Sequence, residues 1–218
     1  MSASPGPGSG PASPPPRAHS VAGHLRAGVV FLVLVLIMAG FGYPAVVTGI
    51  ASVIDPGAAD GSLIHYPNGT VEGSSAIAQN MSTGTLGPDL FWGRPSLTDY
   101  NTTLGADSPP GPTDPALGAL LNETIAYMKL YGTFAVNATL PFWWVAPSAS
   151  SVDPDVVPQA VLVQVLRVAA NNSLTVGFLT GFVNDHIVQP IAPDVGVAYV
   201  NVLELDIALL EYTGNPAW

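Results

Sequence analysis

The sequence contains no cysteine, so neither a disulfide nor a thiolate metal site can stabilise its fold. Positive charge is also scarce, because five Lys and Arg stand against fifteen Asp and Glu and give a net charge of −10. Such an acidic chain is a poor partner for nucleic acid or for anionic lipid headgroups. We therefore expect a fold held by packing, and no nucleic acid among its partners.

The motifs of common hydrolases and nucleotide-binding loops are missing as well. The chain has no Gly-x-x-x-x-Gly-Lys phosphate loop, no Gly-x-Ser-x-Gly nucleophile turn and no His-Glu-x-x-His zinc helix. His186 beside Asp185 could belong to a His/Asp/Ser triad, but neighbouring residues of one helix point apart. Glu204 and Asp206 could bind a metal, but two carboxylates fall short of the roughly six to eight oxygens that calcium prefers. We predict no catalytic residue and no metal site.

One long apolar run dominates the first part of the chain. Ala27–Ile54 carries no charged side chain, and as a helix it would extend ~42 Å, longer than the ~30 Å hydrocarbon core of a bilayer. A secretory signal peptide has a shorter run of ~7–15 residues, although Gly49-Ile50-Ala51 is compatible with a cleavage site. A buried helix of a soluble protein is the remaining alternative. We predict a transmembrane helix over residues 27–54, kinked at Pro44.

Charge on either side of this helix predicts its orientation in a cell membrane. Arg17 and Arg26 precede it without any acidic residue, whereas all fifteen acidic residues follow it with only Arg94, Lys129 and Arg167. By the positive-inside rule, residues 1–26 are cytoplasmic and residues 55–218 form an extracytoplasmic domain. The tail is rich in Pro, Gly and Ser, so we expect it to be disordered.

Glycosylation sequons agree with this orientation. All six Asn-x-Ser/Thr sequences follow the apolar run, which fits a domain outside the cytoplasm, although such short sequences also arise by chance. They begin at Asn68, Asn80, Asn101, Asn122, Asn137 and Asn171.

The chain after Ile54 is long enough for one domain with its own core. Asn68-Gly69 favours a tight turn and predicts a β-hairpin over Ser62–Glu72, while Asp114 and Pro115 can begin a helix whose apolar residues recur through Met128. The other predicted elements are helices at Gly73–Met81, Pro158–Ala170 and Thr175–Asp185, strands at Phe142–Val145 and Tyr199–Leu203, and a short helix from Asp206. This order predicts an α+β layer domain with a small sheet and several helices, in which the last strand returns to the first sheet.

Several short motifs occur in a fixed order along the chain. They are Gly42-Tyr43-Pro44, Gly61–Ile64, Phe91–Ser96, Gly111–Pro115, Ser148–Pro154, Pro158–Ala160 with Gln164, Arg167–Ala169 and Val200–Leu209. No single motif is specific, but their order and spacing over Leu32–Leu210 resemble the KdpC family, the C subunits of the Kdp potassium-transporting P-type ATPase.

This resemblance implies a non-catalytic accessory subunit that joins or stabilises an ATP-driven pump for high-affinity potassium uptake. Its partners would be a P-type subunit that hydrolyses ATP and a potassium-channel-like subunit; a small single-helix subunit is left open. The family is also described as a catalytic chaperone that raises the ATP affinity of the hydrolysing subunit, and the glutamine proposed to touch nucleotide corresponds to Gln79. ATP would be shared with that subunit rather than bound tightly. The alternatives are a membrane-anchored binding or adhesion domain and an ectoenzyme.

Four residues are candidates for contacts with partner subunits. Gly42 and Gly49 are two helical turns apart, and small residues let membrane helices approach closely. Trp92 and Arg94 belong to the most distinctive cluster of the domain. A carboxylate and an aromatic face could hold Arg94 inside the domain, or Arg94 and Trp92 could contact a partner, since both residues are enriched at interfaces.

Overall fold

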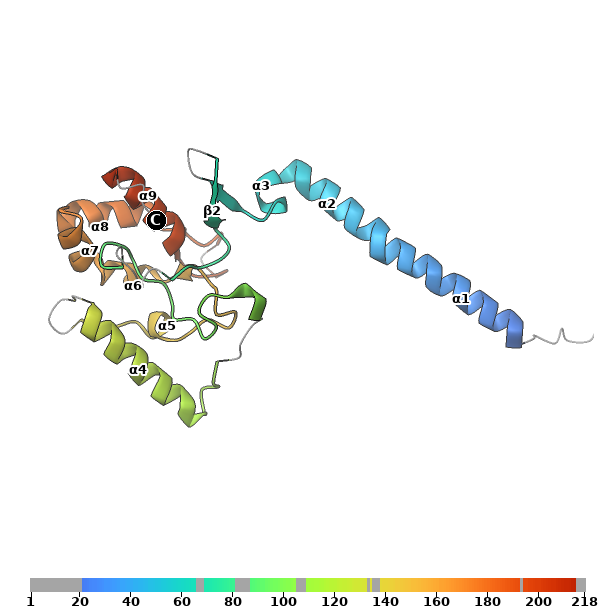
Figure 1. The fold of residues 1–218 in the computed structure, drawn as a ribbon, viewed down its shortest axis with the longest axis horizontal. Coiled ribbons are helices and arrows are strands. Elements are labelled where there is room, and N and C mark those ends of the chain that lie inside the picture. The colour runs from blue at the N-terminus through green and yellow to red at the C-terminus, as the bar shows by residue number, and fades with distance from the viewer. Residues whose placement is uncertain are drawn as a thin grey trace, which may run out of the picture. The chain divides into compact units, whose positions relative to one another are not determined.

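The computed structural model of the protein describes residues 21–65, 69–80, 87–104, 109–132, 134, 138–192 and 194–214. The chain divides into two compact units, Met1–Ala59 and Asp60–Trp218, and each is described by itself. Figure 1 labels the helices and strands of both.

The first unit is one long apolar helix. It consists of α1 (Val21–Ile37), a π-helical segment η1 (Met38–Gly42) and α2 (Tyr43–Ile54), and the short α3 (Pro56–Ala59) follows. By length and composition the 34 residues of Val21–Ile54 can cross a membrane. Neither α1 nor α2 has a side chain that is buried within the chain. Residues 21–26 were predicted to belong to a disordered tail, and this is wrong because the helix begins at Val21. These residues continue the backbone hydrogen bonding of the apolar helix. Residues 1–20 lie outside the described part.

The π-helical segment explains how the helix accommodates Pro44. Proline has no amide hydrogen, and in an α-helix its ring would clash with the carbonyl four residues earlier, here that of Gly40. The Tyr43 amide instead donates to the carbonyl of Met38, five residues back, which widens the turn just before the proline. The kink predicted at Pro44 is therefore wrong: a π-helical turn accommodates the proline, and Figure 1 shows α1 and α2 running on in nearly the same direction.

The second unit begins with the predicted hairpin. Strands β1 (Leu63–His65) and β2 (Val71–Ser74) are antiparallel, with Leu63 opposite Ser74 and an irregularity between Ile64 and His65. The turn residues 66–68 lie outside the described part, and Gly69 has a φ of 82°, which favours glycine. The predicted helix at Gly73–Met81 is wrong over its described residues, because Gly73 and Ser74 pair with β1.

A second small sheet is formed by the two shortest strands. Strand β3 (Asp155–Val156) pairs antiparallel with β4 (Val200–Asn201). The predicted return of the last strand to the first sheet is therefore wrong. The strand predicted to reach Leu203 ends at Asn201, because the Asn201 side chain accepts a hydrogen bond from the Glu204 amide and caps helix α9 (Val202–Thr213).

Helix α4 (Pro115–Tyr131) begins as predicted, with the Asp114 side chain accepting from the Ala116 amide. The predicted strand Phe142–Val145 is instead the single-turn helix α5, which closes with a hydrogen bond from the Ala146 amide to the Phe142 carbonyl after Pro141.

The predicted helix Pro158–Ala170 is divided at Val163 and Gln164. The remaining helices are α6 (Pro158–Leu162), α7 (Val165–Asn171), α8 (Val176–Asp185) and the short 3-10 turn η2 (Thr102–Leu104). The α+β class is confirmed.

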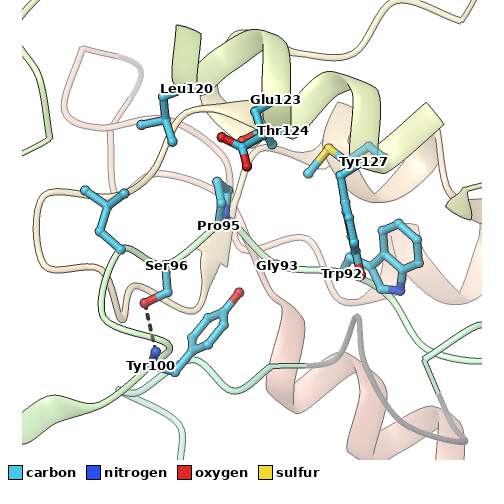
Figure 2. A pocket seen from close by; sticks show the side chains of 11 residues that line it. Trp92, Gly93, Pro95, Ser96, Tyr100, Leu120, Glu123, Thr124 and Tyr127 are labelled. Atoms are coloured by element: carbon cyan, nitrogen blue, oxygen red, sulfur yellow. Dashed lines mark hydrogen bonds between the residues drawn. The ribbon is translucent and has the colours of Figure 1, made fainter. Parts of the chain in front are cut away.

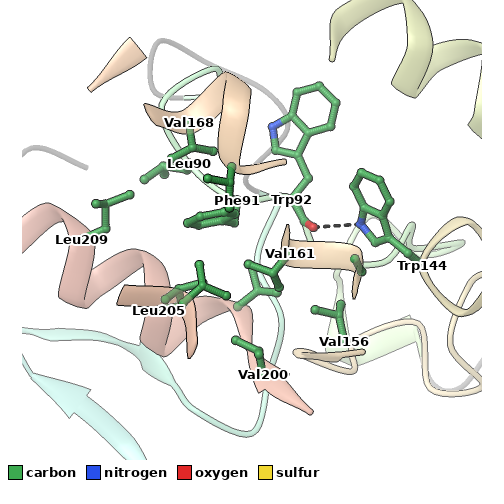
Figure 3. Packing of buried hydrophobic residues seen from close by; sticks show 14 of the residues in the cluster. Leu90, Phe91, Trp92, Trp144, Val156, Val161, Val168, Val200, Leu205 and Leu209 are labelled. Atoms are coloured by element: carbon green, nitrogen blue, oxygen red, sulfur yellow. Dashed lines mark hydrogen bonds between the residues drawn. The ribbon is translucent and has the colours of Figure 1, made fainter. Parts of the chain in front are cut away.

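The core of this unit forms around a segment without helix or strand, residues 87–95, called the central segment below. Figure 3 shows Leu90, Phe91 and Trp92 of this segment among apolar side chains of α6, α7 and α9. Phe91 is fully buried. Burying a side chain of this size stabilises a fold by about 1.5–3 kcal/mol. The segment thus lies inside the domain, although its sequence has no helical or strand period.

Candidate functional site

The backbone of the central segment is bound by side chains instead of by a neighbouring strand. The Phe91 amide donates to Oδ1 of Asp206 on α9 at 2.8 Å, and the Trp92 amide donates to Oε1 of Gln164 at 2.8 Å. The Gln164 amide group returns a hydrogen bond of 3.0 Å to the Trp92 carbonyl. A buried backbone group without a partner would cost about 1–3 kcal/mol, so these polar side chains are needed for the segment to be buried.

Arg167 on α7 closes the same network. Its guanidinium donates to the carbonyls of Gly87 and Pro88 at 3.1 and 2.6 Å, and to Oε1 of Gln164 at 2.7 Å. Its Cζ atom lies 4.2 Å from the centre of the Trp92 ring. A planar guanidinium can make all these contacts at once, whereas a lysine ammonium cannot.

Two buried ionisable groups meet in this network. Burial raises the pKa of Asp206 well above its usual value, and the Phe91 hydrogen bond and the charge of Arg167 partly oppose that rise. Burial lowers the pKa of Arg167 to about 10, with Asp206 and Asp89 acting in the opposite direction. Within the described residues, Oδ2 of Asp206 has no hydrogen-bond partner. The environment therefore favours the neutral acid at Asp206, and α9 holds it there through its buried face.

Arg94 holds the other end of the central segment to the loop before β3. It donates to the carbonyls of Ala146 and Pro147 at 3.2 and 2.9 Å, and forms an ion pair of 3.2 Å with Asp153. The predicted carboxylate contact is thus confirmed. The aromatic contact was predicted for Arg94, but the residue that stacks on Trp92 is Arg167. Contact of Arg94 or Trp92 with a partner stays a prediction.

Gln79 lines a very small cavity of the second unit. It is half-buried beside a cavity of about 10 Å³ that Ala78, Gly93 and Leu203 also line, which is room for about one water. A Cβ added to Gly73 would collide with the Gln79 side chain, so the two residues pack directly. The proposed contact between Gln79 and nucleotide stays a prediction.

Gly42 and Gly49 leave open space on the long helix. A Cβ added to Gly42 would meet only the Ile37 carbonyl at 3.9 Å, and one added to Gly49 would meet nothing within 4 Å. Neither residue is covered within the first unit. Their packing against a partner helix stays a prediction.

A pocket of about 270 Å³ lies between the end of the central segment and helix α4. Figure 2 shows Trp92, Tyr100, Glu123 and Tyr127 around it. Tyr127 contacts Trp92 with ring centres 6.2 Å apart. Sequence reasoning selected Trp92 but missed the other three residues, because the fold joins them from separate segments.

The remaining candidates for chemistry do not assemble into a site. Glu204 is exposed and Asp206 is buried on α9, so the two carboxylates do not face one another. The His186 Nδ1 atom is 2.8 Å from the Phe182 carbonyl oxygen. In the part of the chain that the structure describes, no three or more His, Asp or Glu residues are grouped as metal ligands would be.

Sequence reasoning quoted Gln164, Arg167 and Asp206 but assigned none of them a role in binding the central segment. The signal that could have found them is a polar side chain in an apolar helix. Gln164 and Arg167 stand among Val and Leu residues of the predicted helix Pro158–Ala170, and Asp206 stands between Leu205 and Ile207. Such residues are buried only when paired or hydrogen-bonded.

Comparison with known proteins gives a consistent result. The family model described as "K+-transporting ATPase, c chain" (KdpC) matches residues 25–211. The chain is 36% identical over 188 residues to a protein of Geobacter sulfurreducens, covering 85% of this chain and 96% of that protein. Proteins of Pseudomonas aeruginosa and Methanosphaerula palustris are 37% and 38% identical over 185 residues, each covering 85% of this chain and 95% of the relative. All three relatives are named potassium-transporting ATPase KdpC subunits.

Proposed function

This chain belongs to the KdpC family of potassium-transporting ATPase c chains, and we propose that it is a non-catalytic accessory subunit of an ATP-driven potassium pump. The observation that carries this proposal is the match over residues 25–211, which includes most of the long helix and nearly all of the second unit. Relatives are covered almost to their full length, so the similarity is not restricted to a shared domain.

The proposed partners are the P-type subunit that hydrolyses ATP and the channel-like subunit that passes potassium, with a small single-helix subunit as a third. The exposed apolar helix supports association within the membrane, because lipid or neighbouring helices must cover a surface of this kind. The buried polar network supports a structural role for the second unit. Asp206, Gln164 and Arg167 are used to bind the central segment, and Arg167 also binds Gln164.

The proposed orientation has the N-terminus in the cytoplasm and residues 55–218 outside. Arg17 and Arg26 on one side and the acidic domain on the other support it. Four of the six sequon asparagines are described residues, and all four are exposed, as a glycosylated surface requires: Asn80, Asn101, Asn122 and Asn171.

Any catalytic chaperone effect on ATP affinity is proposed to act through the hydrolysing subunit, without contact between Gln79 and nucleotide. Two observations support this. The cavity beside Gln79 is about 10 Å³, and the side chain packs on Gly73 of the same domain. The proposed orientation also separates Gln79 from cytoplasmic ATP by the membrane.

Affinity purification of the tagged chain from mild-detergent membranes tests the proposed function. We expect a P-type ATPase and a channel-like potassium transport subunit to be recovered together with the chain. A matched chain in which residues 21–54 are replaced by an unrelated transmembrane helix separates assembly through the helix from assembly through the domain. Recovery of no ATPase subunit under conditions that keep other membrane complexes intact would contradict the proposal.

A further inference from the structure

The pocket beside Trp92 has the composition of a site for an organic cation. Aromatic rings of Trp92, Tyr100 and Tyr127 line it, and Glu123 is the charged residue among its lining. The volume of about 270 Å³ is suited to one long side chain and is too small for a nucleotide-sized ligand. Aromatic faces together with a carboxylate attract an ammonium or a guanidinium group.

A strained turn holds one wall of this pocket in place. Asp99 and Tyr100 have φ angles of 52° and 59°, and neither is glycine. The Ser96 hydroxyl oxygen accepts hydrogen bonds from the Thr98 and Tyr100 amides at 3.2 and 2.8 Å. The Tyr100 hydroxyl in turn donates to the Arg94 carbonyl at 2.7 Å, so the ring is fixed before any ligand arrives. Left-handed conformations of residues other than glycine are energetically unfavourable and are typical of binding sites.

The carboxylate of this pocket has no partner among the described residues. Glu123 is exposed on α4, and no described residue forms an ion pair or a hydrogen bond with its carboxylate. Two of the three cations of the second unit are engaged elsewhere, since Arg94 pairs with Asp153 and Arg167 binds the central segment. The Cζ atom of Arg167 lies 4.2 Å from the centre of the Trp92 ring, so one guanidinium already stacks on an aromatic residue of this pocket.

We propose that this pocket receives an arginine side chain of a partner subunit, with the guanidinium against Tyr127 and Tyr100 and paired with Glu123. Arginine fits better than lysine, because a planar guanidinium can stack on a ring and bind a carboxylate at the same time. The excess of acidic residues in this domain would also attract a basic partner surface. The identity of the partner as a pump subunit rests on the proposed function, whereas guanidinium binding does not.

Titration of the full-length chain in detergent micelles tests the pocket directly. The probes are N-acetylarginine amide and its neutral isostere N-acetylcitrulline amide, followed by NMR at the Glu123, Thr124 and Tyr127 amides. We expect arginine to bind roughly tenfold more tightly than citrulline, as one cation–π contact with one exposed ion pair implies. Glu123→Gln should reduce the difference several-fold, because only the cation–π contact remains, whereas Glu211→Gln, which removes an exposed carboxylate of α9, should preserve it. Equal binding of the two probes, or loss of the preference in both variants, would overturn the proposal.

The purified pump gives a second, separate test. We expect Glu123→Gln to reduce recovery of partner subunits several-fold relative to Glu211→Gln at low ionic strength, where an exposed ion pair is least screened. Equal recovery would overturn the assignment of the arginine to a pump subunit. Recovery of no ATPase with the wild-type chain would contradict the proposed function, and the probe titration would still decide whether the pocket binds a guanidinium.

Discussion

Asp206 accepts a hydrogen bond of 2.8 Å from the amide of Phe91, a residue 115 positions earlier in the chain. Both residues are fully buried. The contact joins the central segment to the last helix and satisfies one backbone donor that no strand pairs. An acidic residue is kept at this position in an apolar helix because the backbone needs an acceptor there, and the cost of burying it is reduced because the group is favoured in its neutral form.

Removing this acceptor should destabilise the domain. Asp206→Ala leaves the Phe91 amide unpaired and should lower the free energy of unfolding by about 1–3 kcal/mol, as measured by denaturant unfolding. Asp206→Asn keeps a carbonyl oxygen at the same place and should cost clearly less. If both variants unfold at the same denaturant concentration as the wild type, the hydrogen bond contributes nothing to stability.

Arg94 should be more important for stability than its partly exposed position suggests. Arg94→Lys loses the fork that binds the Ala146 and Pro147 carbonyls together with Asp153, so we expect a loss of about 1–2 kcal/mol in unfolding free energy. Lys129→Arg, an exposed exchange of the same two residue types on α4, should change it by less than about 0.5 kcal/mol. Unchanged stability with weakened pump assembly would instead favour the role of Arg94 at a partner interface. If both remain unchanged, neither role is correct.

Elements with local signals were predictable from the sequence, and α4 is the clearest example. Asp114 and Pro115 indicate where this helix starts, and the apolar spacing that follows indicates which face is buried. A short window of sequence was therefore sufficient. The β1–β2 hairpin was predictable for the same reason, since the Asn68-Gly69 sequence and the two strands are neighbours in the chain. Helix α8 (Val176–Asp185) also lies within the predicted range Thr175–Asp185, and Thr175 caps its first turn.

The remaining parts depend on contacts that no local pattern records. The central segment is bound by Gln164 and Asp206, 72 and 115 residues away from its amides. Strands β3 and β4 have two residues each, too few for an alternating pattern to identify their partner. At Phe142–Val145 aromatic residues favour a strand, but burial of the consecutive residues Trp144 and Val145 favours one helical turn.

Asp155 should make stability depend on pH in the acidic range. Burial, followed by the charges of Asp153 and Glu204, raises the pKa of Asp155 from 3.8 to about 6. Because the folded chain binds this proton more tightly than the unfolded chain, the contribution of Asp155 is largest below about pH 3.8 and is lost as pH rises through about 6.

The test compares melting temperatures of wild type and Asp155→Asn. The variant cannot lose a proton at this position, so its melting temperature should rise relative to the wild type between about pH 4 and about pH 6.5. Asp194→Asn, at an exposed aspartate, should follow the wild type over this range. A constant difference between wild type and Asp155→Asn at every pH would show that this carboxyl titrates alike in the folded and unfolded chains.

The absence of cysteine makes the membrane orientation simple to measure, because one introduced cysteine is the only thiol. We expect Asn122→Cys, at an exposed position of α4, to react with a membrane-impermeant maleimide in intact cells. Ser13→Cys in the N-terminal tail should react only after the cells are permeabilised, because the proposed orientation, based on Arg17 and Arg26, places this tail in the cytoplasm. Labelling of Ser13→Cys in sealed cells would reverse the proposed orientation.

Close packing of the long helix against a partner should depend on Gly42. A Cβ at Gly42 or Gly49 finds open space within this chain, so Gly42→Leu should leave folding and membrane insertion intact. Association of membrane helices depends on van der Waals packing at small residues, and a leucine would hold the partner backbone away. We therefore expect a several-fold lower recovery of the pump complex in mild detergent. Gly28→Leu introduces the same side chain on the same helix, where a Cβ also meets nothing within 4 Å, and should leave recovery unchanged. Equal recovery of both variants would mean that the second unit, and not this helix face, holds the subunit in the complex.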